Sequence, residues 1–250
     1  RFNLDVKWVA WARRRIEMYH YIDDKEFLKR MKSLCADIVN QLVQSINNDS
    51  VMTVEAHLIG SGAKKLITQN AKAPIDLDYN LSVLEVYGIS FNDGRAIKEH
   101  IRTHFNAVLK RNGWGDCQDS TSALSTKYRC FKKGNKTRFK IDLGIIRENT
   151  YGWERLIHEK TGVVCFDKWY WNIARASKGL DDKVESIKDA NFWNEVRDLY
   201  IEKKNMYLCR NDHNHPSFNV YIETINEIYN KYFESDCQSS LFCQTHKFHR

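Results

Sequence analysis

The sequence predicts a mixed α/β fold that ends in helices, and three observations support this prediction. In the first part of the chain, apolar residues recur at three- and four-residue steps in some segments and alternate with polar residues in others. From Asp181 onward, only the helical spacing remains. The balance of charged side chains also changes sign close to this point. A region of helices and strands is therefore followed by a region of helices alone.

The change in charge places the expected domain boundary near Lys178-Gly179. Residues 1–180 hold 30 basic and 20 acidic side chains, whereas residues 181–235 hold 7 basic and 11 acidic ones. We predict a main domain with N-terminal helices over residues 1–178, a helical segment over 179–235 and a tail over 236–250.

Hydrophobic spacing predicts the elements of the main domain in turn. Asp23-Asp24-Lys25-Glu26 is typical of a helix start, because carboxylates in the first turn face the positive end of the helix dipole. The apolar residues that follow at helical steps are Leu28, Met31, Cys35, Ile38, Leu42 and Ile46. Next we expect a strand over 51–59, a short helix after Gly60-Ser61-Gly62, a strand over 75–83, and a helix carrying Ile97, Ile101, Phe105 and Val108.

Two hairpins are expected in the second half of the main domain. The β-rich runs 124–131 and 137–146 flank a glycine-containing turn, Lys132-Lys133-Gly134-Asn135-Lys136. Residues 152–171 are predicted to form a further hairpin around Lys160-Thr161-Gly162. The helices that follow carry apolar residues on one face, among them Val196, Leu199, Ile222, Ile225 and Ile228.

Composition bounds the class of protein. The chain has 250 residues, of which 42% are hydrophobic, enough for a sizeable core without disulfide or metal staples. No apolar run approaches the ~18–20 residues that a bilayer span needs, so we expect no membrane partner. Two prolines and eleven glycines exclude collagen-like and Pro-rich architectures. The net charge of +7 suits polyanionic partners, although a solubilising surface would give the same total.

The seven cysteines indicate a cytoplasmic protein, because their number is odd and most of them stand far apart, as reduced thiols do. The tail is an exception, since Cys237, Cys243, His246 and His249 would supply four zinc ligands. Their spacing matches no closed zinc motif, and frayed terminal residues are the simpler interpretation. We leave metal binding by the tail open.

Three aspartates stand inside otherwise apolar strand-like runs. Asp76 and Asp78 share one face of the strand that contains Ile75-Asp76-Leu77-Asp78-Tyr79, because side chains alternate with period two. Arg138, Lys140 and Asp142 share a face of a later strand in the same way. A solvated strand face is the simpler interpretation of one such pair, but aspartate is disfavoured in strands and occurs here three times.

If the two strands are neighbours, the three carboxylates converge. Like charges this close raise one another's pKa unless cations neutralise them. Two Mg²⁺ (or Mn²⁺) ions about 3.5–4 Å apart would do so, and such a pair assists in-line phosphoryl and nucleotidyl displacement. Carboxylates together with water and substrate phosphates are the ligands that Mg²⁺ prefers.

Gly60-Ser61 lies at the expected end of a strand and just before a helix. Such a pair is usually only a turn. Before a helix, however, it allows a phosphate to approach backbone N–H groups and the helix dipole. Lys64 and Lys65, one turn further on, would reach a triphosphate tail, and we group Lys140 with them as nucleotide-binding. The spacing is not that of a P-loop. The basic turn at 132–136 would either bind an acceptor's phosphates or form a solvated ribbon.

Together these motifs resemble the DNA polymerase β-like nucleotidyltransferase superfamily. The family pattern is a strand ending in Gly-Ser, then Asp-x-Asp on the next strand and a third Asp on a later one; here these are Gly60-Ser61, Asp76-Leu77-Asp78 and Asp142. The resemblance spans roughly residues 51–147. Fourteen residues separate Ser61 from Asp76, more than we expect in the cyclic-oligonucleotide and oligoadenylate synthases, so the branch is left open.

The resemblance implies a mixed sheet flanked by helices and a two-metal site on Asp76, Asp78 and Asp142. It also implies that Gly60 and Ser61 hold the β- and γ-phosphates of an NTP while an acceptor hydroxyl attacks the α-phosphate. Asp142 would be the base for that hydroxyl.

The leading hypothesis is therefore a metal-dependent nucleotidyltransferase that moves NMP from an NTP to a hydroxyl and releases pyrophosphate. The acceptor is left open among RNA, another nucleotide, a small molecule and a protein, as is the oligomeric state. The alternative is a non-catalytic nucleotide- or RNA-binding module on the same fold. A module that only binds polyanions gains nothing from three carboxylates in its cleft.

Overall fold

The computed structural model describes residues 18–174, 179–212 and 215–234. The chain divides into two compact units, one of Tyr21–Ala176 and one of Arg1–His20 together with Ser177–Arg250. Within the described ranges, no helix is both long and apolar enough to cross a membrane. The tail residues considered as zinc ligands, Cys237, Cys243, His246 and His249, lie outside the described residues.

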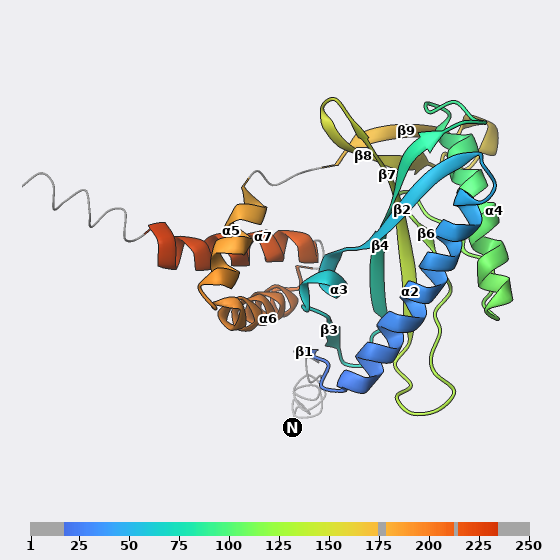
Figure 1. The fold of residues 1–250 in the computed structure, drawn as a ribbon. Coiled ribbons are helices and arrows are strands. Elements are labelled where there is room, and N and C mark those ends of the chain that lie inside the picture. The colour runs from blue at the N-terminus through green and yellow to red at the C-terminus, as the bar shows by residue number, and fades with distance from the viewer. Residues whose placement is uncertain (1–17, 175–178, 213–214, 235–250) are drawn as a thin grey trace, which may run out of the picture. The chain divides into compact units, whose positions relative to one another are not determined.

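The unit of residues 21–176 alternates helices and strands (Figure 1). In chain order, following β1 (Tyr19–Tyr21), the elements are α2 (Lys25–Asn47), β2 (Met52–Leu58), α3 (Gly60–Lys64), β3 (Thr68–Asn70), β4 (Ile75–Val86), α4 (Gly94–Arg111), β5 (Gln118–Asp119), β6 (Leu124–Ser125), β7 (Phe139–Asn149), β8 (Gly152–Glu159), the 3-10 helix η1 (Val164–Phe166) and β9 (Lys168–Ile173). Both long helices start at an aspartate N-cap: Phe27 N–H donates to Asp24, and Ala96 N–H donates to Asp93, each at 2.9 Å.

The strands form a mixed sheet in the order β2-β4-β7-β6-β5, and β8 and β9 continue from β7. Among the described strands of this sheet, only the central pair, β4 with β7, is parallel, while the other neighbours are antiparallel. A parallel pair needs a long crossover connection, and α4 lies within the one that joins β4 to β7. The predicted mixed sheet flanked by helices is therefore confirmed.

The hydrophobic core lies between this sheet and the helices α2 and α4 (Figure 1). Alternate residues of β4, namely Ile75, Leu77, Tyr79 and Leu81, are buried in the same cluster as the apolar stripes of both helices. Their neighbours on β4 consequently point to the opposite face of the sheet. The sheet thus has one face covered by α2 and α4 and a second face that carries the polar residues of β4.

The structure corrects two expectations about local structure. The strand predicted over 124–131 is wrong beyond Ser125, where only an isolated bridge from Arg129 to Phe139 remains. Thr126 interrupts the ladder, because its hydroxyl, in place of a carbonyl, accepts the hydrogen bond from Ile141 N–H at 2.9 Å. The short helix begins at Gly60 instead of after Gly62, since the positive φ of Gly60 turns the chain directly from β2 into α3.

The other unit contains the predicted helices, α5 (Leu180–Asp189), α6 (Trp193–Cys209) and α7 (Ser217–Tyr229), followed by a π-helical turn, η2 (Asn230–Glu234). Val196 and Tyr200 on α6 are buried, as are Val220 and Ile225 on α7. Tyr19 belongs to this unit, because its backbone exchanges two hydrogen bonds with the amide of Asn205, at 2.7 and 3.1 Å.

Candidate functional site

The three aspartates lie on two adjacent strands in the centre of the sheet. In the parallel register of β4 and β7, Asp78 is directly opposite Asp142, and Asp76 is opposite Lys140. All four side chains lie on the face of the sheet that α2 and α4 do not cover. We call Asp76, Asp78 and Asp142 the carboxylate cluster. The residues that the sequence placed on two separate strand faces are thus brought together.

Lys140 is the cation of the carboxylate cluster. Its Nζ lies 2.8 and 3.0 Å from the two carboxylate oxygens of Asp142 and 3.7 Å from Asp76 Oδ2. The Lys140 side chain is 17% exposed, so these contacts are partly shielded from water. An ammonium group held among carboxylates shows that this position favours positive charge.

One ammonium group does not balance three carboxylates. Burial, followed by the charges of Asp142 and Asp76, raises the pKa of Asp78 to about 6. Burial also raises the pKa of Asp76, with the charge of Asp142 acting in the same direction. Burial would lower the pKa of Lys140, but its hydrogen bond to Asp142 and the two nearby carboxylates raise it. The cluster therefore retains uncompensated negative charge.

This donor set fits hard divalent cations such as Mg²⁺. It offers carboxylate oxygens alone, and its excess negative charge is what such an ion would neutralise. Lys140 Nζ already places one positive charge between Asp142 and Asp76. Asp76, Asp78 and Asp142 are thus the residues that could hold a metal pair.

Gly60 fixes the distance between α3 and the carboxylate cluster. Its φ is +60°, and a Cβ atom built on it would lie 2.9 Å from Asp78 Oδ2. The preceding residue, Ile59, donates its N–H to Asp78 O at 2.9 Å. Glycine is therefore required at this position both for the backbone angle and for space. As a result, the Gly60-Ser61 backbone lies against Asp78.

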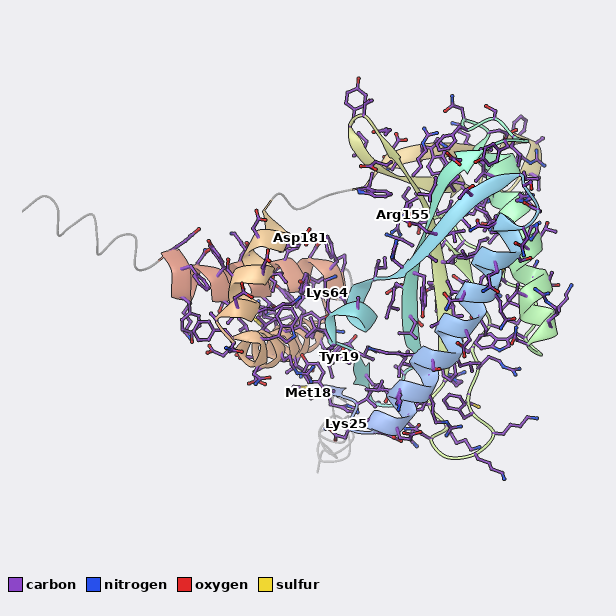
Figure 2. All side chains as sticks on the ribbon, viewed as in Figure 1. Met18, Tyr19, Lys25, Lys64, Arg155 and Asp181 are labelled. Atoms are coloured by element: carbon purple, nitrogen blue, oxygen red, sulfur yellow. The ribbon has the colours of Figure 1, made fainter. Side chains whose placement is uncertain are left out.

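The two lysines after this glycine turn lie at the C-terminal end of α3. Lys64 is half-buried on α3 (Figure 2), and Lys65 caps the helix in a left-handed conformation and is exposed. Burial and then the charge of Lys65 lower the pKa of Lys32, whose Nζ donates to Gly62 O at 2.7 Å. Lys65 therefore lies on the α2 side of α3.

Sequence reasoning missed several residues that extend the same face. Asn80 and Ser82 follow Asp78 at strand spacing, and this spacing alone would have identified them. Arg155 on β8 (Figure 2) donates to Asn80 Oδ1 at 2.9 Å, and its charge lowers the pKa of Asp78. Arg155 fits because Gly144 leaves room: a Cβ there would lie 3.2 Å from the guanidinium carbon.

A cavity of about 640 Å³ lies further along this face, and its lining residues do not include the three carboxylates. Asn80, Ser82 and Arg155 line one part of it, and Tyr151 and Trp153 line another. Ser82 Oγ is buried and makes no hydrogen bond within the described residues. A polar atom without a partner at the wall of a cavity is available to a bound molecule.

Comparison with solved structures shows which fold carries these residues. The chain is similar to Escherichia coli MS115-1 CdnC, solved with ATP, with a TM-score of 0.53 and 12% identity over 86% of this chain and 63% of that one. The chain has a polymerase β-like nucleotidyltransferase fold. The resemblance seen in the sequence is therefore confirmed at the level of the fold.

Other solved structures match over different lengths. Elizabethkingia meningoseptica CdnE cyclic dinucleotide synthase, solved with GTP and Apcpp, has a TM-score of 0.47 at 10% identity, covering 79% of this chain and 70% of that one. Vibrio cholerae DncV cyclic AMP-GMP synthase has a TM-score of 0.43 at 12% identity over 61% of this chain, which spans only 39% of DncV. No family model and no curated protein matches the sequence.

Within this nucleotidyltransferase fold, the long spacing between Ser61 and Asp76 has a structural explanation. The extra residues form β3 (Thr68–Asn70) and a turn in which Ala73 N–H donates to Asn70 O at 2.8 Å. The side chain of Gln69 closes the same turn through a 2.7 Å hydrogen bond to Ala73 O. This segment thus lies between α3 and β4, and the register of β4 with β7 is regular beyond it.

Proposed function

We propose that this chain transfers NMP from an NTP to an acceptor hydroxyl and releases pyrophosphate. The observation that carries the proposal is the pairing of Asp78 with Asp142 across parallel strands, with Asp76 beside them and the Gly60 backbone against Asp78. On a nucleotidyltransferase fold, this arrangement supports phosphoryl chemistry more than any other reaction class.

The proposed metal ligands are Asp76, Asp78 and Asp142. Two Mg²⁺ or Mn²⁺ ions held there would neutralise the triphosphate and lower the pKa of the attacking hydroxyl. The raised pKa of Asp78 supports this assignment, because burial and the two neighbouring carboxylates outweigh the charges of Lys140 and Arg155 there.

The chain's own residues account for the rest of the step. The first turn of α3 leaves backbone N–H groups without helical partners, and these groups and the Ser61 hydroxyl would donate to the β- and γ-phosphates. Lys64 and Lys65 would add charge on the same side, and Lys140 would exchange a carboxylate for a phosphate oxygen. The new bond joins the acceptor oxygen to the α-phosphorus, the bond from that phosphorus to the leaving pyrophosphate breaks, and Asp142 takes the hydroxyl proton.

Transfer of radiolabel tests the proposal. Each α-labelled NTP would be incubated with Mg²⁺ or Mn²⁺, alone and with total cellular RNA. Asp78→Asn is the site variant, and Glu85→Gln is the matched control, because Glu85 lies exposed at the far end of the same strand. We expect labelled product and pyrophosphate from the wild type and from Glu85→Gln, and about a 10³-fold lower rate from Asp78→Asn.

The size of the product would identify the acceptor class, since a cyclic or short oligonucleotide, tailed RNA and modified protein separate on gels and columns. If the affinity for nucleotide is unchanged when a chelator removes the metal but falls steeply as the salt concentration rises, the non-catalytic binding module is supported instead. Transfer by Asp78→Asn at the wild-type rate would overturn the assignment of the carboxylate cluster.

A further inference from the structure

A second group of metal-ligating side chains lies in the helical layer on the other face of the sheet. Asp49 follows the C-terminal end of α2, and His100 and His104 are one turn apart on α4. One ligand atom from each residue lies within 4.8 Å of the other two. We call these three residues the histidine cluster. None of them belongs to the carboxylate cluster or lines the cavity beside it.

The geometry of the histidine cluster converges on one point. Asp49 Oδ2 lies 2.7 Å from His100 Nε2 and 2.9 Å from His104 Nε2. The two imidazole rings are tilted by 45° with centroids 4.7 Å apart. All three side chains are about one-fifth to one-quarter exposed, so the site is partly shielded but open to an entering ion.

The atoms behind these ligands hold them in place. Ser45 Oγ lies 2.8 Å from His104 Nδ1, and Val51 N–H donates to Asp49 Oδ1 at 3.0 Å. Such contacts fix the ring and leave Nε2 and Oδ2 directed at the common point. Metal-binding histidines characteristically use their second ring nitrogen in this way.

His100 supplies an independent observation. Its Nε2 is buried and makes no hydrogen bond within the described residues, even though Asp49 Oδ2 is close. His158, which is elsewhere in this unit, behaves differently: its two nitrogens are hydrogen-bonded to Asp119 and Asp167, at 2.7 and 3.0 Å. Both ring nitrogens of His158 are thus hydrogen-bonded to protein groups, whereas the 2.7 Å contact of His100 Nε2 with Asp49 Oδ2 lacks hydrogen-bond geometry and suits two ligands of one shared ion.

We propose that Asp49, His100 and His104 form a zinc site that ties the end of α2 to α4. Two imidazole nitrogens and one carboxylate oxygen are typical zinc ligands, with a fourth position left for water. Ligand atoms around tetrahedral zinc stand about 3.3 Å apart, given bonds of about 2.0–2.1 Å. The distances from Asp49 Oδ2 to the two Nε2 atoms would need to increase by only about half an ångström to reach this spacing. Imidazole ligands favour zinc over Mg²⁺, which takes oxygen.

The test measures zinc and cobalt binding by the full chain. Cys237→Ser/Cys243→Ser is introduced as the common background, because the tail carries other zinc ligands, and excess Mg²⁺ occupies the carboxylates. After treatment with a chelator, we expect one zinc ion per chain on titration. Bound Co²⁺ should show visible bands of a nitrogen- and oxygen-ligated ion without thiolate charge transfer.

Three variants locate the ion. His104→Gln should lose binding by more than about 100-fold, and Ser45→Ala should weaken it by about 10–100-fold, because it removes a partner behind the ligand. His20→Gln, an exposed histidine of the other unit, should bind as the background does. If circular dichroism shows that His104→Gln folds poorly, the zinc affinity of Ser45→Ala decides whether the ion binds at this cluster. Equal zinc affinity in the background, His104→Gln and Ser45→Ala would overturn the proposal, as would the absence of stoichiometric zinc.

Discussion

The two sides of the central sheet carry two different kinds of acidic site. On the open face, strand periodicity aligns three carboxylates, and the charges of Lys140 and Arg155 offset theirs only in part. On the covered face, helix periodicity stacks two imidazoles, and loop residue Asp49 meets both. The first set consists of oxygen ligands with excess negative charge, and the second mixes nitrogen with oxygen. Ligand type, rather than acidity alone, therefore separates the proposed reaction site from the proposed zinc site.

The two sites also differ in their cost to the folded state. Burial and mutual repulsion raise the pKa of Asp78, which means that its ionised form destabilises the fold. Asp49, in contrast, accepts a backbone hydrogen bond and faces two imidazoles. Carboxylates whose pKa is raised in this way cluster at functional sites, which supports the function proposed for the open face.

Apart from the proposed metal ligands themselves, the largest expected effect concerns the glycine that positions Asp78. In Gly60→Ala, the new methyl group must displace the Asp78 carboxylate, because the Cβ would stand 2.9 Å from Oδ2. We expect about a 10²-fold loss of nucleotidyl transfer, since small displacements of reacting groups have effects of this size. The measurement is the rate with labelled NTP at saturating Mg²⁺.

Gly113→Ala is the matched control at the end of α4. Gly113 also has a positive φ, +71°, but a Cβ there meets nothing within 4 Å. Both variants should lose about 1 kcal/mol of unfolding free energy from backbone strain. Only Gly60→Ala should lose the reaction, and equal rates in the two variants would show that Asp78 is not part of the reaction site.

The next effect is a pH dependence confined to the open face. The pKa of Asp78 is about 6, so protonation removes a metal ligand as the pH falls through this value. We expect the apparent Mg²⁺ affinity to drop about tenfold for each pH unit below 6. Because Mg²⁺ favours the ionised form, excess Mg²⁺ should restore the rate at pH 5.5.

Lys140→Met sharpens this test. The charge of Lys140 lowers the pKa of both Asp78 and Asp76, so its removal should move the midpoint of the profile to higher pH. Activity that is lost at pH 5.5 and not restored by Mg²⁺ would instead indicate acid unfolding.

The sequence predicted the carboxylate cluster well because strand alternation is a local property. The pattern of 75–79 and 138–143 determined which side chains share a face, and the structure keeps those faces. The parallel pairing of these strands, about sixty residues apart, rests on the crossover through α4, which periodicity alone does not determine. The family resemblance implied a mixed sheet and a site shared by the three aspartates, but not the parallel pairing of these strands.

Residues whose position depends on how distant strands pair or how helices pack were not predicted. Arg155 reaches Asn80 only because β8 pairs with β7 so that Ile146 is opposite Arg155. The i, i+4 spacing of His100 and His104 was visible in an expected helix, but Asp49 joins them only through the packing of α2 on α4. The end of β6 was mispredicted because a single threonine hydroxyl replaced a ladder partner.

A smaller effect compares one carboxylate from each side of the sheet. With metal removed by a chelator, Asp78→Asn should raise the unfolding free energy at pH 7.5 by about 1–2 kcal/mol, a figure reduced because Asp78 is only partly buried. The sign follows from the raised pKa: the folded state binds the proton more tightly, so stability falls as the pH rises from about 4 to 6. The gain should therefore shrink at pH 4.5.

Asp49→Asn should do the opposite under the same conditions. It weakens the contacts of the carboxylate with His100 and His104, so we expect a loss of about 1 kcal/mol. Urea unfolding of both variants at the two pH values gives the comparison. Destabilisation by Asp78→Asn at pH 7.5 would contradict the view that this carboxylate is held at a cost to the fold.

The smallest expected effect compares two buried hydroxyls. Ser82 Oγ lines the cavity beside the carboxylate cluster and has no hydrogen bond within the described residues, whereas Thr126 Oγ1 accepts one from Ile141 N–H. Ser82→Ala should keep the stability of the wild type and raise the KM for NTP or acceptor by about 2–10-fold, the value of one hydrogen bond. Thr126→Val should lose about 1 kcal/mol of stability because it leaves that N–H unpaired. An unchanged KM in Ser82→Ala for every substrate would place the bound molecule outside this cavity, because a buried hydroxyl at the wall of an occupied site does not stay without a partner.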